Sequence, residues 1–163
     1  HLPVIRALVL ELMEGVVPAP AVRNTARLPG ADFALKRWLI RRTGGSALLP
    51  ELAVRQLPHN RVLLGVYDFG AGDYGARMRH WLGLLPATGG LLFCHPGLGG
   101  AQEPTDPIGG ARMRELDYLA SDRFLHDLEA AGVSLARRGG PQENVHRLLI
   151  PKVSSKARPV AST

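Results

Sequence analysis

The sequence predicts an α/β protein in which a parallel sheet is covered by helices. Two short apolar runs, residues 62–67 and 91–94, have the length and composition of buried strands, and turn residues bound both of them. Segments with apolar residues at helical spacing lie before, between and after these runs. Strands that alternate with helices along a chain are typical of parallel sheets, because the crossover between two parallel strands is usually a helix.

The helices follow from the spacing of apolar residues and from turn residues at their ends. The first is expected over residues 3–14, from Pro3 to the residue before Gly15, with an apolar set of Val4, Ile5, Leu8, Val9 and Leu12. The same reasoning predicts helices over residues 33–42, 47–57, 74–85, 111–120 and 122–131, with a break at residues 43–46.

The remaining segments are expected to be short strands or irregular. Residues 16–21, interrupted by two prolines, are expected to be a short strand or an extended segment. Residues 133–136 and 145–150 have the pattern of short strands. The polar and basic residues 151–163 are expected to be disordered, so the predicted domain spans residues 1–150.

Length and composition are those of an ordinary globular protein. The 163 residues suffice for one domain, and 45% hydrophobic and 21% charged residues are usual for such a domain. No apolar run approaches the ~18 residues that a membrane span needs, so we expect no membrane partner. The single cysteine, Cys94, excludes an internal disulfide and favours a reducing, cytoplasmic compartment.

The net charge of +6 raises the question of nucleic-acid binding. Nearly all of the positive charge comes from arginine, since the lysines are Lys36, Lys152 and Lys156. These arginines are scattered along the chain, and no basic stripe alternates with aromatic residues. We therefore expect general surface charge rather than a nucleic-acid partner.

His95 is the first candidate functional residue. It follows the strand predicted over residues 91–94, which Pro96 and Gly97 end. Functional residues of parallel α/β proteins gather at the carboxyl ends of the strands. The alternative is a histidine that merely terminates a core strand. Adjacent strand residues face opposite sides, so Cys94 is expected to point away from His95, which argues against a cysteine–histidine nucleophilic pair.

Three blocks of the chain carry a family pattern. They are HNRVLLGVYDF at residues 59–69, FCHPG at residues 93–97, and a run from DPI at 106–108 through RMREL at 112–116 to LASD at 119–122. Arg23, after the proline-rich segment, matches a recurring arginine. In this order and spacing the blocks resemble the YdjC-like carbohydrate deacetylases, the family of chito-oligosaccharide deacetylase, over roughly residues 1–137.

The resemblance implies a fold, a reaction and a metal. The fold would be a partial, distorted (β/α) barrel of mostly parallel strands with helices outside. The reaction would be the hydrolytic removal of an acetyl group from an N-acetylated sugar or oligosaccharide, with divalent magnesium or zinc held by an aspartate and two histidines. His1 resembles the last histidine of the family's cluster, although one residue fewer separates it from the following proline. The aspartate pair and the upstream histidine have no counterpart, so we expect the C-terminal part of such a protein, inert unless another segment or chain supplies them.

The resemblance also suggests roles for individual residues. His95 would be the general acid that protonates the leaving amine, a task suited to an imidazole that titrates near neutral pH. Asp68, Arg112 and Arg23 would bind substrate. Asp68 could instead orient an imidazole or stabilise a turn. Arg112 could fix the loop of residues 96–110 or, on the plainer interpretation, pair at the surface with Glu115, three residues further along the same helix.

Two other function classes stay open at this point. One is a non-catalytic sugar-binding or assembly module that keeps the fold without the metal site. The other is a basic nucleic-acid binder, whose affinity would depend strongly on salt. The expected partners under the leading hypothesis are an N-acetylated carbohydrate and a second copy of the chain in a homodimer.

Overall fold

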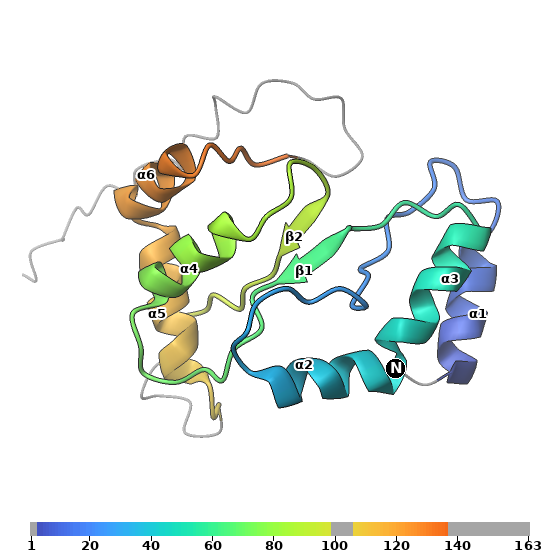
Figure 1. Cartoon of the computed structure of the whole chain (residues 1–163), viewed down its shortest axis with the longest axis horizontal. Coiled ribbons are helices and arrows are strands. Elements are labelled where there is room, and N and C mark those ends of the chain that lie inside the picture. Colours follow the sequence, from blue (N-terminus) through green and yellow to red (C-terminus); the bar gives the residue numbers. More distant parts are fainter. Residues whose placement is uncertain (1–2, 99–105, 137–163) are drawn as a thin grey trace, which may run out of the picture.

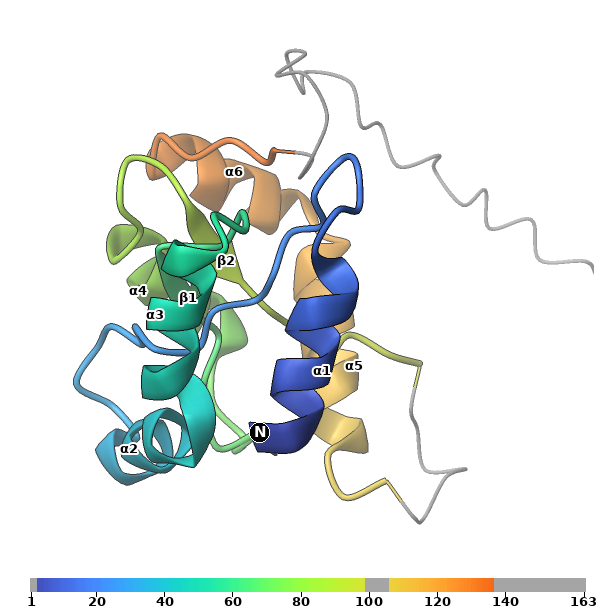
Figure 2. The same ribbon diagram turned by 90° about the vertical axis from the view of Figure 1, so that its right-hand side faces the viewer.

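The computed structural model describes residues 3–98 and 106–136. In order, the elements are α1 (Pro3–Met13), α2 (Ala34–Ile40), η1 (Arg41–Gly45), α3 (Ser46–Val54), β1 (Val62–Leu64), α4 (Tyr74–Gly83), β2 (Gly90–Leu92), α5 (Gly109–Leu119) and α6 (Asp122–Ala130). The strand pair lies in the middle with helices around it in both views (Figure 1, Figure 2). None of these helices is long and apolar enough to cross a membrane. The structure is thus a mixed helix and strand fold with a small parallel sheet, which agrees with the predicted α/β class.

The sheet consists of β1 and β2, which run parallel with Val62 opposite Gly90 and Leu64 opposite Leu92. Helix α4 forms the crossover between them (Figure 1). The pairing extends one residue beyond the strands, where the Phe93 N–H donates to the Leu64 carbonyl at 3.2 Å. Within the ranges that the structure describes, the strands form this two-stranded sheet and do not close into a barrel.

A third segment runs parallel to β1 without forming a regular strand. Val22 and His59 form a parallel bridge, and the Leu63 N–H donates to the Arg27 carbonyl at 2.9 Å. Between these points two buried amides, Asn24 and Asn60, replace the backbone ladder. Asn24 N–H donates to Asn60 Oδ1 at 2.7 Å, and Asn60 Nδ2 donates to the Asn24 carbonyl at 2.8 Å. The side chains thereby satisfy polar groups that burial would otherwise leave unpaired.

The described residues bury two separate apolar clusters. The larger one joins β1 to the helices α4, α5 and α6 and contains Leu64, Tyr67, Tyr74, Met78, Trp81, Leu82, Tyr118 and Leu128. The smaller one joins α1 to α3 and contains Leu10, Leu52 and Leu57. The residues expected to face inward from α4 are confirmed, since Met78, Trp81 and Leu82 are buried and Leu85 packs against the larger cluster.

The apolar faces of α1 and α2 are exposed, contrary to the amphipathic interpretation of the sequence. In α1 the buried residue is Leu10, whereas the predicted apolar set is exposed, with Val4 at 80% and Leu12 at 69%. In α2, Leu35 and Trp38 are likewise exposed. The spacing correctly predicted the helices. Spacing alone does not show which neighbouring element covers the apolar face of a helix. Among the described residues, α1 packs against α3 on one side.

Several predicted segments differ from the structure. The strands expected over residues 62–67 and 91–94 are shorter, at Val62–Leu64 and Gly90–Leu92, and β2 is exposed to half-buried rather than buried. The expected break at residues 43–46 is a kink, because η1 connects α2 to α3 through Gly44 at a φ of 138°. Residues 133–136 are not a strand. Gly132, at a φ of 62°, ends α6 and lets the Val133 N–H donate back to the Leu128 carbonyl at 2.9 Å. The strand predicted over residues 145–150 and the tail 151–163 lie outside the described residues.

Gly65 allows the segment after β1 to lie close to the segment after β2. Its φ is +95°, and a Cβ there would collide with the Phe93 carbonyl oxygen. We expect Gly65→Ala to lower the free energy of unfolding by at least ~2 kcal/mol, through the backbone conformation and the collision together. Urea unfolding followed by circular dichroism measures the change.

The matched control is Gly83→Ala. Gly83 is the exposed last residue of α4, and a Cβ there meets nothing within 4 Å. We expect this variant to be stabilised by about 0.5–1 kcal/mol, because alanine loses less backbone entropy than glycine in a helix. Equal effects of the two substitutions would contradict the proposed contact at Gly65.

Asp127 ties α6 to its two neighbouring helices. Its carboxylate accepts from the Tyr118 hydroxyl of α5 at 2.7 Å and from Arg79 of α4 at 3.3 Å. The Tyr118 hydrogen bond, with help from Arg79, holds the pKa of the Asp127 carboxyl below its ordinary value of 3.8.

This lowered pKa predicts an acid-sensitive contribution to stability. The contribution of Asp127 to the free energy of unfolding is complete above the ordinary pKa of 3.8. It is lost as pH falls below that value, because the carboxyl then binds a proton more readily in the unfolded chain than in the native one. We expect Asp127→Asn to flatten the fall in stability in that range. The exposed Asp117 of α5 provides the control, Asp117→Asn. Parallel pH profiles for Asp127→Asn and the parent chain would contradict the assignment.

Candidate functional site

The structure places His95 just beyond the carboxyl end of β2, as the sequence predicts. The segment that follows β1 reaches the same edge, because the two strands are parallel. The imidazole stands between two phenyl rings, with ring centroids 5.2 Å from Phe69 and 4.9 Å from Phe93, both in an edge-on arrangement. Its side chain is 27% exposed. The ring is therefore neither sunk in the core nor free in solvent.

Glu115 of α5 lies beneath this imidazole and is 0% exposed. One carboxylate oxygen accepts the backbone N–H of His95, and the other accepts the Tyr67 hydroxyl. The latter oxygen is also 3.7 Å from His95 Nδ1, which is buried and has no hydrogen-bond partner. Burial, followed by the contact with Glu115, raises the pKa of Tyr67, so its hydroxyl stays protonated and acts as the donor.

The pairing of Arg112 with Glu115 suggested by their spacing is not formed. Arg112 instead pairs with Asp106, Nε to Oδ2 at 2.8 Å, and its Nη1 donates to the His95 carbonyl at 3.3 Å. Glu115 turns inward because α5 buries the face that carries Ala111, Glu115 and Tyr118. The expected apolar residue Met113 is 42% exposed. Of the roles considered for Arg112, fixing the loop beside His95 is the one with contacts in the structure.

Asp68 lies at the turn after β1 and does not orient the imidazole. Its carboxylate accepts the Gly70 N–H at 3.0 Å and lies 3.6 Å from Arg77. The Gly70 hydrogen bond lowers the pKa of the Asp68 carboxyl, with a smaller contribution from Arg77. The turn-stabilising role is therefore the one that the contacts support, and the position next to the imidazole belongs to Glu115.

Two cations lie close to the phenyl rings that contact His95. Arg23, which the family pattern singled out, is exposed and places its guanidinium carbon 5.8 Å from the centre of the Phe93 ring. The Lys36 ammonium is 4.9 Å from the Phe69 ring and donates to the Tyr67 carbonyl at 2.6 Å. Both groups can donate hydrogen bonds to oxygen atoms of a ligand near the imidazole.

The site does not favour cysteine chemistry, and the described residues do not form a metal site. Burial raises the pKa of the Cys94 thiol, which disfavours the thiolate needed for nucleophilic attack. In residues 3–98 and 106–136, no three histidine, cysteine, aspartate or glutamate side chains gather as metal ligands. The predicted ligand His1 lies outside these ranges.

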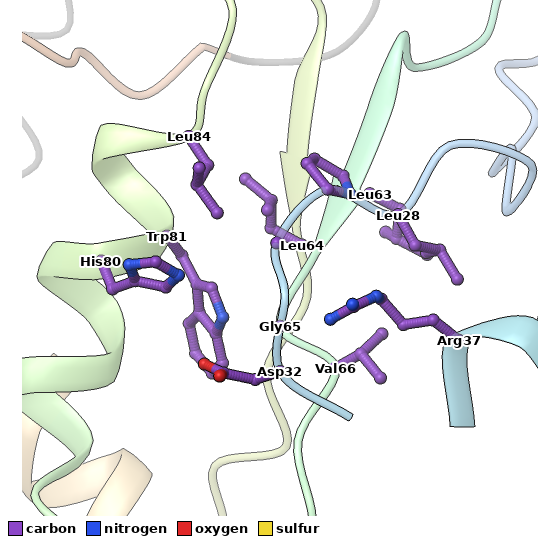
Figure 3. A pocket seen from close by; sticks show the side chains of 12 residues that line it. Leu28, Asp32, Arg37, Leu63, Leu64, Gly65, Val66, His80, Trp81 and Leu84 are labelled. Carbon is purple, nitrogen blue, oxygen red and sulfur yellow. The ribbon is translucent and has the colours of Figure 1, made fainter. Parts of the chain in front are cut away.

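A separate hollow lies between residues 28–32, the end of β1 and helix α4 (Figure 3). Asp32, Arg37, His80 and Trp81 are among its lining residues, and Gly65 and Val66 form part of its floor. His95 and Glu115 do not line it. This hollow and the site around His95 are thus distinct features.

Sequence reasoning located His95 and Arg23 but missed the groups that enclose the imidazole. Phe93 and Phe69 were assigned only to a strand and a turn, and Glu115 to a surface pair. One signal for Glu115 was present in the sequence: it stands four residues after Ala111 and three before Tyr118, a spacing that puts all three on one helix face.

A comparison with protein families identifies the group to which the chain belongs. The model of the family described as YdjC-like protein matches residues 1–130, which include every site residue named above. No curated protein and no solved structure matches the chain. The family is one of carbohydrate deacetylase-type hydrolases. Because the match spans most of the 163 residues, the chain belongs to the YdjC-like family.

Proposed function

We propose that this protein contributes to hydrolytic removal of the acetyl group from an N-acetylated sugar or oligosaccharide, with His95 as the general acid. Family membership supports the hydrolase class. The observation that carries the role of His95 is its position: a partly exposed imidazole at the joined carboxyl ends of two parallel strands, above a buried carboxylate.

The reaction needs a proton at the nitrogen of the leaving group. Water adds to the acetyl carbonyl carbon, the C–N bond breaks, and the products are acetate and a free amine. An amine leaves readily only when its nitrogen is protonated, and an imidazolium can supply that proton at neutral pH. His95 would give its proton to the amine nitrogen, become neutral and regain a proton from solvent. Phe69 and Phe93 contact the imidazole edge-on beside its exposed part.

The substrate would be held by groups around the imidazole. Arg23 and Arg112 are the proposed binding residues, since guanidinium groups donate hydrogen bonds to hydroxyl and carbonyl oxygens of a sugar. Arg23 is exposed beside Phe93, whereas Arg112 already contacts the His95 carbonyl. Asp68 remains a proposed partner for a sugar hydroxyl, because its carboxylate is 54% exposed despite the turn that it stabilises.

A divalent metal, magnesium or zinc, remains part of the proposal, with His1 as the proposed ligand. The described residues do not themselves fit such an ion, and no step above runs through it. We also propose a partial (β/α) barrel, supported by β1, β2 and the parallel segment next to β1, and a cytoplasmic location, supported by the single cysteine.

Replacement of the imidazole tests the proposed acid. We expect His95→Ala, made in a full-length protein that also supplies the aspartate and histidine metal ligands, to lower the rate of acetate release from an N-acetylated chito-oligosaccharide by at least ~100-fold, because the leaving amine loses its proton donor. An enzymatic acetate assay measures the rate, and circular dichroism shows whether the fold is retained.

The control is His126→Gln, on the exposed face of α6. This variant should release acetate at the parent rate. Near-normal activity of a folded His95→Ala chain would refute the general-acid role. Binding of the oligosaccharide without acetate release by the full-length protein, at any added metal concentration, would favour the non-catalytic sugar-binding module instead.

Chelation tests the metal part of the proposal. In the full-length protein, we expect incubation with EDTA and removal of the chelator to abolish acetate release, and re-addition of Mg²⁺ or Zn²⁺ to restore it, because a bound divalent ion would supply Lewis-acid chemistry for amide hydrolysis. The ion that restores activity at the lowest concentration is the functional one. Undiminished activity after chelation would remove the metal from the proposed mechanism.

A further inference from the structure

We propose that Glu115 is a positioning residue that holds the neutral His95 ring as its Nδ1–H tautomer, which leaves Nε2 as the nitrogen that exchanges protons with the substrate. The importance of this arrangement for catalysis rests on the proposed function. The arrangement itself rests on the geometry of the two side chains alone.

The first argument is the supply of acceptors around the ring. An ionised carboxylate offers about four lone-pair sites on its two oxygens. On Glu115 the recorded donors are the His95 N–H at one oxygen and the Tyr67 hydroxyl at the other. The oxygen that accepts Tyr67 therefore has a free lone pair, and that oxygen lies 3.7 Å from His95 Nδ1.

The second argument is the state of Nδ1 itself. This atom is buried and has no hydrogen-bond partner, and an unpaired buried polar group is costly. In a neutral imidazole one nitrogen carries the proton, and the hydrogen bond that each nitrogen makes decides which one it is. A carboxylate can only accept hydrogen bonds. A proton on Nδ1 therefore makes the interaction between Nδ1 and the Glu115 oxygen 3.7 Å away attractive.

The third argument is the exposure of the ring. Nδ1 is buried while the side chain as a whole is 27% exposed, so the exposed part of the ring lies away from Nδ1. With Nδ1–H directed at Glu115, the imidazolium gives its other proton, from Nε2, to the leaving amine. The ring then returns to the neutral Nδ1–H form.

A purely structural role for Glu115 is the competing explanation, since its carboxylate also joins the chains that follow β1 and β2. Glu115→Gln separates the two roles. The glutamine oxygen can accept the His95 backbone N–H, and its amide can donate to the Tyr67 oxygen and to Nδ1. The fold is thereby kept, while the amide now requires an unprotonated Nδ1. The tautomer should therefore switch to Nε2–H.

The measurement is the two-bond ¹H–¹⁵N correlation spectrum of the histidine rings in the full chain, recorded at a pH where neutral imidazole dominates. The chain has six histidines, and the signals missing from His95→Gln identify those of His95. We expect Nδ1–H in the parent chain and Nε2–H in Glu115→Gln. Tyr67→Phe keeps the carboxylate and is the matched control, so its His95 ring should remain Nδ1–H.

Kinetics provides the second measurement. We expect Glu115→Gln to lower kcat by at least ~10-fold and to change KM by less than about threefold, because the ring loses its orientation while the substrate contacts remain. Glu115→Asp, which keeps the charge on a shorter side chain, should recover part of the lost kcat.

The outcomes separate this inference from the proposed function. An Nε2–H ring in the parent chain, or a switch of tautomer in Tyr67→Phe, overturns the role of Glu115 even if the chain releases acetate. An Nδ1–H ring that switches in Glu115→Gln supports it even if no acetate is released, in which case the proposed function fails alone. The parent spectrum decides by itself if Glu115→Gln does not fold.

Discussion

The buried carboxylate of Glu115 is the interaction on which the arrangement of the site depends. It accepts the Tyr67 hydroxyl from the chain after β1 and the His95 N–H from the chain after β2. A fully buried charge is destabilising unless its hydrogen-bonding capacity is used. Here α5 provides the carboxylate, and the two strand ends provide the donors. The three segments therefore come together at the imidazole for a reason that apolar packing alone would not supply.

The second constraint is the narrowness of the sheet. With β1 and β2 as its regular strands, the described part of the chain needs other contacts to keep parallel segments in place. Gly65 allows the backbones to approach where a side chain would not fit, and the amides of Asn24 and Asn60 take the place of ladder hydrogen bonds. Both features lie on the chain segments that lead to the site.

The sequence allowed the α/β class, the two strands and the position of His95 to be predicted, because these depend on local patterns. Apolar runs bounded by turn residues identify strands wherever they pair. The faces of α1 and the role of Glu115 were not predicted, because both depend on which element lies opposite. An acidic residue on a helix is usually exposed, and only its alignment with Ala111 and Tyr118 indicates otherwise. The predicted sites His1, Asp68, Arg23 and Arg112 remain proposals as to function.

The attachment of α1 to α3 has a consequence for the behaviour of the protein in different buffers. Beside the small cluster around Leu10, this attachment consists of ion pairs, Arg6 with Glu51 at 3.4 Å and Arg55 with Glu14 at 2.9 Å, which are partly open to solvent. Dissolved counterions weaken such pairs, whereas they strengthen or leave unchanged the burial of apolar groups around Trp81. Ionic strength also weakens pairs such as Arg79 with Asp127 in the half that carries the imidazole, but the larger apolar cluster holds those helices together. Salt therefore loosens the amino-terminal helix more than the rest of the described structure.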